Sequence, residues 1–173
     1  AIIVVPNYQA AETIPLDICE VSGVPLNPEE NWSLDIDRIK NEIRPNTKLI
    51  SINFPNNPTG AILGRERFDE LINICRHSGL YLFSDEVYRL MEHDIRLRLP
   101  QVGDIYERGL SLNVMSKAYG LPGLRLGWIM CKDENILQNM ERYKHYLSIC
   151  NSAPSEHLSI IASKAKQQIL DRN

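Results

Sequence analysis

Short apolar runs of strand length alternate along the chain with segments of helical period, and this alternation limits the folds that are open to it. The runs cover residues 1–5, 48–54, 80–84, 110–115 and 126–131. Residues 33–43 and 65–78, which lie between runs, repeat apolar residues on one helical face. Strands that alternate with helices predict an α/β domain with a largely parallel sheet, covered by helices on both faces.

The last strand is expected to run against the others. Only about ten residues separate the run that ends at Met115 from the run that begins near Leu126, whereas a parallel crossover usually takes a dozen or more. The pattern therefore predicts a mixed sheet, parallel except at this edge.

Four helices are predicted outside the strands. The first begins with Ser33 as its N-cap, and the second ends at Gly79. The other two follow the last strand: apolar residues repeat at helical spacing from Ile136 to Leu147, and again after Pro154 as far as Ile169.

Composition and charge exclude several classes of protein. Nineteen basic and 22 acidic residues among 173 give a net charge of −3, so we expect no nucleic-acid or membrane partner. No run reaches the roughly 18 apolar residues of a membrane helix. Four scattered cysteines form no metal-binding or disulfide pattern, which predicts free thiols, no metal and a cytoplasmic location. The start at Ala1, without methionine, suggests a piece of a longer chain.

Three polar segments rich in glycine or proline stand at predicted strand ends. They are residues 56–60 (NNPTG), 84–89 (SDEVYR) and 116–128 (SKAYGLPGLRLGW). Ligands of open α/β sheets bind outside the carboxyl ends of the strands. The three segments are therefore expected to converge on one ligand.

The spacing of these segments resembles that of the pyridoxal-phosphate-dependent aminotransferases of classes I and II. The third motif, S-K-x-x-G-L-x-G-x-R-x-G, is the most specific, and the resemblance runs from Pro6 to about Ala165. It implies the family's large domain, a three-layer α/β/α sandwich with a mostly parallel mixed sheet, and pyridoxal 5'-phosphate as cofactor.

The resemblance implies that Lys117 forms the Schiff base with the cofactor and shuttles a proton at the substrate α-carbon. This role needs a lysine that can lose its proton near neutral pH, which desolvation and nearby cations can arrange. Asp85 would hold the pyridine nitrogen protonated, so that the ring acts as an electron sink. The alternatives are a solvated lysine and an N-cap aspartate.

Three further residues would contact the cofactor ring. Tyr88 and Asn57 would donate hydrogen bonds to its phenolic oxygen, and Tyr8 would stack on its face. The resemblance also implies a cis bond between Asn57 and Pro58. The alternatives are half-buried core tyrosines for Tyr88 and Tyr8 and a turn residue for Asn57.

Arg125 would clamp the cofactor phosphate with its guanidinium fork, and Ser116 would add a hydroxyl contact. We expect Arg125 to lie in a strand between apolar neighbours; its alternative is a surface salt bridge. Many family members carry a second hydroxyl three residues before the lysine, where this chain has Val114. Weaker cofactor binding is therefore expected.

The remaining charged residues receive no role in the predicted site. Solvated faces are the interpretation for Glu86, Arg89, the pair Asp69 and Glu70, and residues 96–98, and a satisfied structural role is assigned to the four histidines.

Family members are more than twice as long as this chain. The resemblance implies that residues 1–173 are one cofactor-binding domain, without the phosphate loop that would precede it and the small domain that would follow it. The parent protein would be a homodimer, and the isolated piece is expected to be inactive.

Three functions remain open at this stage. The first is transamination between an amino acid and a 2-oxo acid, as in amino-acid biosynthesis. The second is a related carbon–sulfur lyase or cyclopropane-forming synthase. The third is an aminotransferase-like sensor domain of a transcription regulator.

Overall fold

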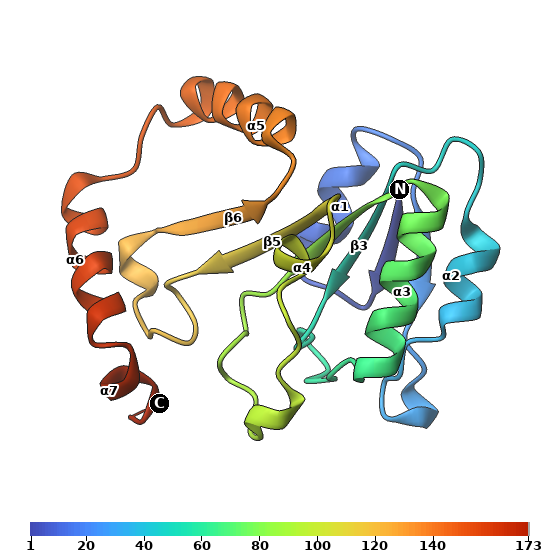
Figure 1. The fold of residues 1–173 in the computed structure, drawn as a ribbon, viewed down its shortest axis with the longest axis horizontal. Helices are drawn as coiled ribbons and strands as arrows, with labels where there is room; N and C mark the ends of the chain where they lie inside the picture. The colour runs from blue at the N-terminus through green and yellow to red at the C-terminus, as the bar shows by residue number, and fades with distance from the viewer. Residues whose placement is uncertain (173) are drawn as a thin grey trace.

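The computed structural model describes residues 1–172, which form one six-stranded sheet with helices on both faces (Figure 1). The strands are β1 (Ile2–Val5), β2 (Ser22–Pro25), β3 (Leu49–Asn53), β4 (Tyr81–Asp85), β5 (Gly109–Val114) and β6 (Gly127–Cys131). They lie in the order β2-β1-β3-β4-β5-β6. All neighbouring pairs are parallel except β5 and β6, which are antiparallel, as the short connection predicts.

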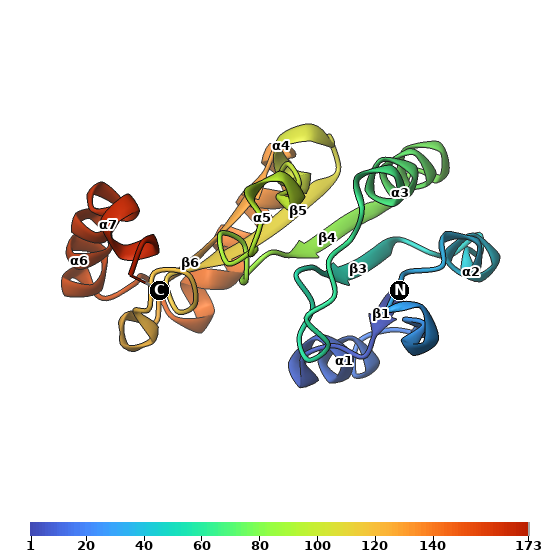
Figure 2. The same cartoon turned by 90° about the horizontal axis from the view of Figure 1, so that it is seen from below.

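The helices lie around this sheet. They are α1 (Gln9–Leu16), α2 (Ile36–Glu42), α3 (Arg65–Ser78), α4 (Val102–Ile105), α5 (Glu134–Leu147), α6 (Ala153–Lys164) and α7 (Lys166–Leu170). Figure 2 shows α3 and α1 on opposite sides of the sheet, while α6 and α7 lie beyond its β6 edge. No helix among the described residues is long and apolar enough to span a membrane.

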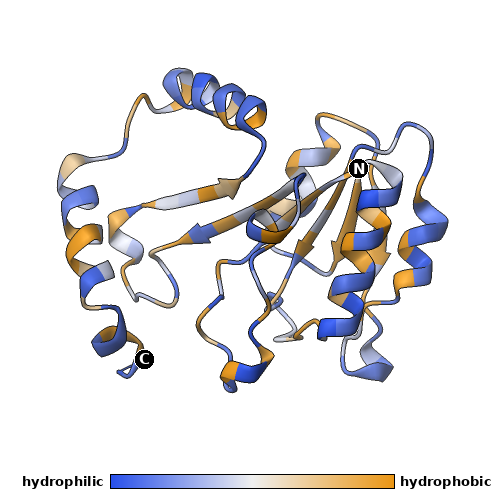
Figure 3. Cartoon of the chain, in the orientation of Figure 1, coloured by the Kyte–Doolittle hydropathy of each residue, from blue (hydrophilic) through white to orange (hydrophobic). Residues whose placement is uncertain are grey.

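The core lies between the central strands and the helices α2 and α3. Ile2, Ile3 and Val4 of β1 are at most 1% exposed, which fits the continuous apolar run expected of a strand that is buried on both faces. Figure 3 shows the same contrast: the central strands are hydrophobic, whereas the outer helices carry many hydrophilic residues.

The predicted helix starting at Ser33 begins later. Asp35 is the N-cap of α2, because its side chain accepts hydrogen bonds from the amides of Asp37 and Arg38. Ser33 pairs instead with Asn27 in an isolated β-bridge. The helix over residues 65–78 is confirmed, with Gly79 as its left-handed C-cap.

Four further elements differ from the predictions. Strand β2 and the helices α1 and α4 were not predicted, since β2 (SGVP) lacks an apolar run, α1 contains Pro15 and α4 has only four residues. The last predicted helix is two helices, α6 and α7, which are separated at Ala165.

Helix α4 sits directly against the backbone of the β5–β6 hairpin. A Cβ atom added at Gly103 would overlap the carbonyl oxygen of Met130 in β6, and one added at Gly109 would overlap the carbonyl of Val102. Glycine at these two positions therefore lets α4 approach the sheet more closely than any larger residue would allow.

We predict that Gly103→Ala lowers the free energy of unfolding by about 2 kcal/mol, because the obstacle is backbone that must shift as a unit. Gly123→Ala is the control: a Cβ atom added there would have no heavy atom within 4 Å, so stability should stay within about 0.5 kcal/mol. Urea denaturation measures both values. Equal stability of the two variants would contradict the close packing of α4.

Candidate active site

The carboxyl ends of β3, β4 and β5 lie at the same end of the sheet, and the polar segments of the sequence follow them. Because β3 and β4 pair in parallel register, Asn53 lies opposite Asp85 at the end of both strands. Strand β5 pairs with β4 on the other side, so the turn that follows it, with Ser116 and Lys117, opens at the same edge.

Asp85 is the last residue of β4 and is 8% exposed. Its Oδ1 accepts a hydrogen bond from the Val87 amide at 3.1 Å. Burial raises the pKa of the Asp85 carboxyl, while this hydrogen bond and the positive charge of Lys117 act in the opposite direction. No ion pair within residues 1–172 involves Asp85, so its negative charge is only partly compensated by the chain itself.

Lys117 lies in the turn after β5 with an exposed side chain. Its Nζ is 5.2 Å from the centroid of the Tyr88 ring, within the range of a cation–π contact. Together with the electrostatic coupling to Asp85, this contact brings three of the predicted residues, Lys117, Asp85 and Tyr88, into one cluster.

Asn57 joins this cluster through a buried residue that the sequence interpretation did not include, Asn53. The Asn57 amide donates to Asn53 Oδ1 at 2.8 Å, and Asn53 Nδ2 donates to the carbonyl of Asp85 at 3.0 Å. One side chain, 1% exposed, thus ties two of the predicted segments together. The bond between Asn57 and Pro58 is cis, as the resemblance implied.

Ser116 and Arg125 lie near the two ends of the loop between β5 and β6. The amide of Met115 donates to the carbonyl of Leu126 at 3.0 Å, and the two predicted phosphate contacts flank this pair. The placement of Arg125 in a strand was wrong. It has a left-handed backbone (φ 50°) at the end of a 3-10 turn, which strand residues do not adopt, and its Nη1 donates to the Pro122 carbonyl.

Tyr8 is an exposed residue that follows β1. It is the N-cap residue of α1, without a side-chain capping hydrogen bond, and is 58% exposed. Asn56 Nδ2 donates to the Pro6 carbonyl at 3.1 Å, so the backbone before Tyr8 is fixed to the loop that carries Asn57. Within residues 1–172, no hydrogen bond or cation–π contact joins the Tyr8 ring to the other six predicted residues.

Comparison with known proteins identifies the family. The family model described as "Aminotransferase class I and II" matches residues 3–172. The chain belongs to the class I and II aminotransferase family.

Individual relatives agree with this assignment. Capreomycidine synthase of Streptomyces vinaceus is 32% identical over 80% of this chain and 35% of its own length. Aromatic-amino-acid aminotransferase 2 of Thermococcus litoralis is 30% identical over 82% of this chain and 36% of its own. A crystal structure of a PLP-dependent aminotransferase from Streptococcus suis matches with a TM-score of 0.90 and 36% identity.

The chain is short beside these aminotransferases. It spans about a third of the length of the curated relatives named above. The match to the Streptococcus suis structure covers 99% of this chain but only 45% of that chain. The shared part is the sheet domain, which confirms the predicted three-layer architecture.

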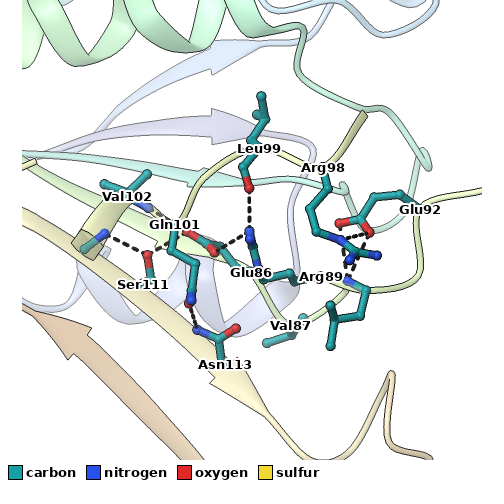
Figure 4. A network of polar contacts seen from close by, with 12 residues as sticks. Glu86, Val87, Arg89, Glu92, Arg98, Leu99, Gln101, Val102, Ser111 and Asn113 are labelled. Atoms are coloured by element: carbon teal, nitrogen blue, oxygen red, sulfur yellow. Dashed lines mark hydrogen bonds and ion pairs between the residues drawn. The ribbon is translucent and has the colours of Figure 1, made fainter. Parts of the chain in front are cut away.

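The solvated interpretation of Glu86 and Arg89 was wrong (Figure 4). The Glu86 side chain is 5% exposed, and its carboxylate lies 3.4 Å from Nη1 of Arg89. Its partners, Ser111 and Val102, are 25 and 16 residues away in sequence, so no local pattern could reveal them.

The other interpretations of charged residues have mixed outcomes. Asp69 and Glu70 lie on an exposed face, as predicted, where they pair with Arg65 and Lys40. Arg96 is exposed, but Arg98 forms an ion pair with the nearly buried Glu92. All four histidines are exposed, but Nδ1 of His77 lies 2.7 Å from the Asn73 carbonyl oxygen, so the satisfied role holds for this residue.

We predict that Asp85→Asn raises the stability of the cofactor-free protein at pH 7 by on the order of 1 kcal/mol. Because burial raises the Asp85 pKa, the folded state binds this proton more tightly than the unfolded state. The charged carboxylate therefore destabilises the folded state. This destabilisation is complete above the Asp85 pKa of the folded protein and vanishes as the pH falls below the ordinary value of 3.8. Chemical denaturation at several pH values measures the difference between variant and parent.

Asp133→Asn is the control, and its change in stability is expected to have the opposite sign. Tyr81 donates a 2.8 Å hydrogen bond to Asp133 and lowers the pKa of that carboxyl, so its loss should reduce stability at pH 7. An Asp85→Asn variant that is less stable than its parent at pH 7 would show that the charged carboxylate is not penalised in this fold.

Proposed function

We propose that this chain is the cofactor-binding part of a pyridoxal-phosphate-dependent aminotransferase, which passes an amino group from an amino acid to a 2-oxo acid. The observation that carries the proposal is the cluster of Lys117, Asp85 and Tyr88 at the carboxyl ends of β4 and β5. The names of relatives support transamination: they include aromatic-amino-acid, aspartate and N-succinyldiaminopimelate aminotransferases. Capreomycidine synthase represents the synthase alternative.

The residues present fit the cofactor. A nearly buried carboxylate with a raised pKa and no ion pair among the described residues suits a cationic group such as a protonated pyridine nitrogen. Asp85 would therefore hold the ring nitrogen, with Asn57 and Tyr88 at the phenolic oxygen and Tyr8 at the ring face. Arg125 and Ser116 would hold the phosphate from the β5–β6 loop.

When bound, the cofactor supplies an electron sink for the electron pair left at the substrate α-carbon. Lys117 would take the α-proton of the substrate on its Nζ and pass it to the cofactor. The centroid of the Tyr88 ring lies 5.2 Å from this Nζ, and the ring would help to orient it. Asp85 would supply the negative charge that keeps the ring nitrogen protonated, so the reaction depends on how firmly its carboxylate is held.

The surroundings of this domain are part of the proposal. The chain's share of its relatives' length supports a single cofactor-binding domain within a longer protein, whose isolated 173 residues would not turn over substrate. Exposed apolar residues of α5, including Tyr143, Tyr146 and Leu147, support a homodimer or a further domain that covers them. Four free cysteines support the cytoplasm.

We predict that borohydride reduction of the pyridoxal-phosphate-loaded protein attaches the cofactor to Lys117, as peptide mass analysis would show. The control is Lys166, which lines a cavity together with Ala118 and Tyr119 and is thus a competing lysine nearby. Lys166→Arg should leave the labelling unchanged, and Lys117→Arg should abolish it. A label on Lys166, or on any other lysine, would refute the assignment.

We predict that Arg125→Lys weakens binding of pyridoxal phosphate about tenfold, since a point charge replaces a bidentate fork. Binding of pyridoxal, which lacks the phosphate, should change little. Calorimetric titration with both compounds separates the two effects. Equal losses for the two compounds would mean that Arg125 acts on the fold of the loop and not on the phosphate.

A further inference from the structure

Glu86 directly follows Asp85 and carries a second buried carboxylate (Figure 4). Its Oε1 accepts hydrogen bonds from the Ser111 hydroxyl at 2.6 Å and from the Val102 amide at 3.1 Å, and its Oε2 lies 3.4 Å from Nη1 of Arg89. Successive residues of an extended chain point to opposite faces. The Glu86 side chain therefore contacts the protein interior, whereas the Asp85 side chain belongs to the candidate site.

The contacts of Glu86 converge from three parts of the chain. Ser111 belongs to β5, and its Oγ also accepts from the Gly103 amide of α4 at 2.9 Å. Val102 is the first residue of α4. Arg89 also donates to the Leu99 carbonyl at 2.7 Å, so the loop before α4 is held as well.

These contacts fix the turn that carries Tyr88. The Glu86 amide donates to the Leu112 carbonyl of β5, and the Arg89 amide donates to the Glu86 carbonyl, both at 2.9 Å. Tyr88 lies inside this turn, and the Val87 amide in the same turn holds the Asp85 carboxylate. Loosening the turn would therefore move both groups that face Lys117.

We propose that Glu86 is a positioning residue: its carboxylate clamps the turn after β4 to β5 and α4, and so sets where Asp85 and Tyr88 stand relative to Lys117. The inference rests on the proposed function of the site. A stabilising role alone would not call for a charge here, because an apolar residue of similar volume often replaces a buried ion pair without loss of stability. The fold also opposes this charge, since burial raises the pKa of Glu86.

The chain contains a matched control for this clamp. Glu92 and Arg98 form an ion pair whose side chains are 5% and 24% exposed, against 5% and 21% for Glu86 and Arg89. Glu92 also accepts hydrogen bonds from the Leu90 amide. Among the described residues, its hydrogen bonds and ion pair stay within residues 90–98 and do not reach β4, β5 or α4.

The test compares Glu86→Gln with Glu92→Gln in the full-length protein. In each variant a neutral amide replaces a carboxylate that faces one arginine, so both lose a partly buried ion pair. Three quantities are measured. The first is amide hydrogen exchange of the cofactor-free protein, and the second is the rate at which bound pyridoxal phosphate is released. The third is the pH midpoint at which the visible absorption of the bound cofactor changes.

Glu86→Gln should increase exchange at the amides of Val87 and Arg89, release the cofactor about tenfold faster and shift the titration midpoint. Glu92→Gln should leave all three measurements near those of the parent protein. Equal effects in the two variants, or no effect in either, would overturn the proposal.

Ser111→Ala is the second variant if Glu86→Gln does not fold. It keeps the Glu86 charge and its ion pair with Arg89 but removes one donor to Oε1. It should shift the titration midpoint in the same direction by a smaller amount; a folded variant with the parent's midpoint would overturn the clamp. A parent protein that binds no pyridoxal phosphate would refute the proposed function, whereas the exchange comparison in cofactor-free protein would still decide whether the clamp exists.

Discussion

The in-register parallel pairing of β3 with β4 is the constraint on which the candidate site depends. It sets Asn53 opposite Asp85, and the amide group of Asn53 then bonds the Asp85 carbonyl on one side and the Asn57 amide on the other. A shift of one residue would turn every side chain of a strand to the other face of the sheet. Asp85 would then lie in the interior and Glu86 in the site.

The antiparallel pair β5 and β6 gives the candidate site a loop that carries three of its residues, whereas the parallel strands supply its buried residues. Because β6 is antiparallel to β5 and begins at the end of the sheet where β5 stops, one loop carries Ser116, Lys117 and Arg125. The close approach of α4 to this hairpin, which Gly103 makes possible, places the Val102 amide within reach of Glu86. The packing of α4 on the sheet thereby helps to place the Glu86 side chain at the end of β4.

Sequence reasoning predicted the elements whose signal is local. Buried strands such as β1 and β4 are continuous apolar runs, and α3 shows a clear helical period that ends at a glycine. Strand β2 has no such signal, because as an edge strand it pairs only with β1 and carries glycine and proline. Ser33 was predicted as a helix cap, but its backbone pairs with Asn27 in a β-bridge, and the Asp35 side chain caps the helix instead.

The site could be predicted only as far as its residues follow motifs. Lys117, Asp85 and Tyr88 stand at characteristic spacings, and the structure brings them together. The supporting residue Asn53 lies outside the motifs, and Glu86 received no role although it lies within the segment 84–89. The role of both consists of contacts with distant strands and loops. The left-handed backbone of Arg125 is likewise set by the loop that closes on Met115 and Leu126, and not by its apolar neighbours.

Asp85 and Glu86 show how one strand end serves both structure and chemistry. Burial raises the pKa of both carboxyls, so the fold resists a negative charge on each of them. For Glu86 the chain supplies compensation, in the form of Arg89, a hydroxyl and a backbone amide. For Asp85 it supplies one amide and the partial influence of Lys117. The incompletely compensated carboxylate is the one that faces the site, where a cationic ligand gains most from it, and the compensated one holds it in place.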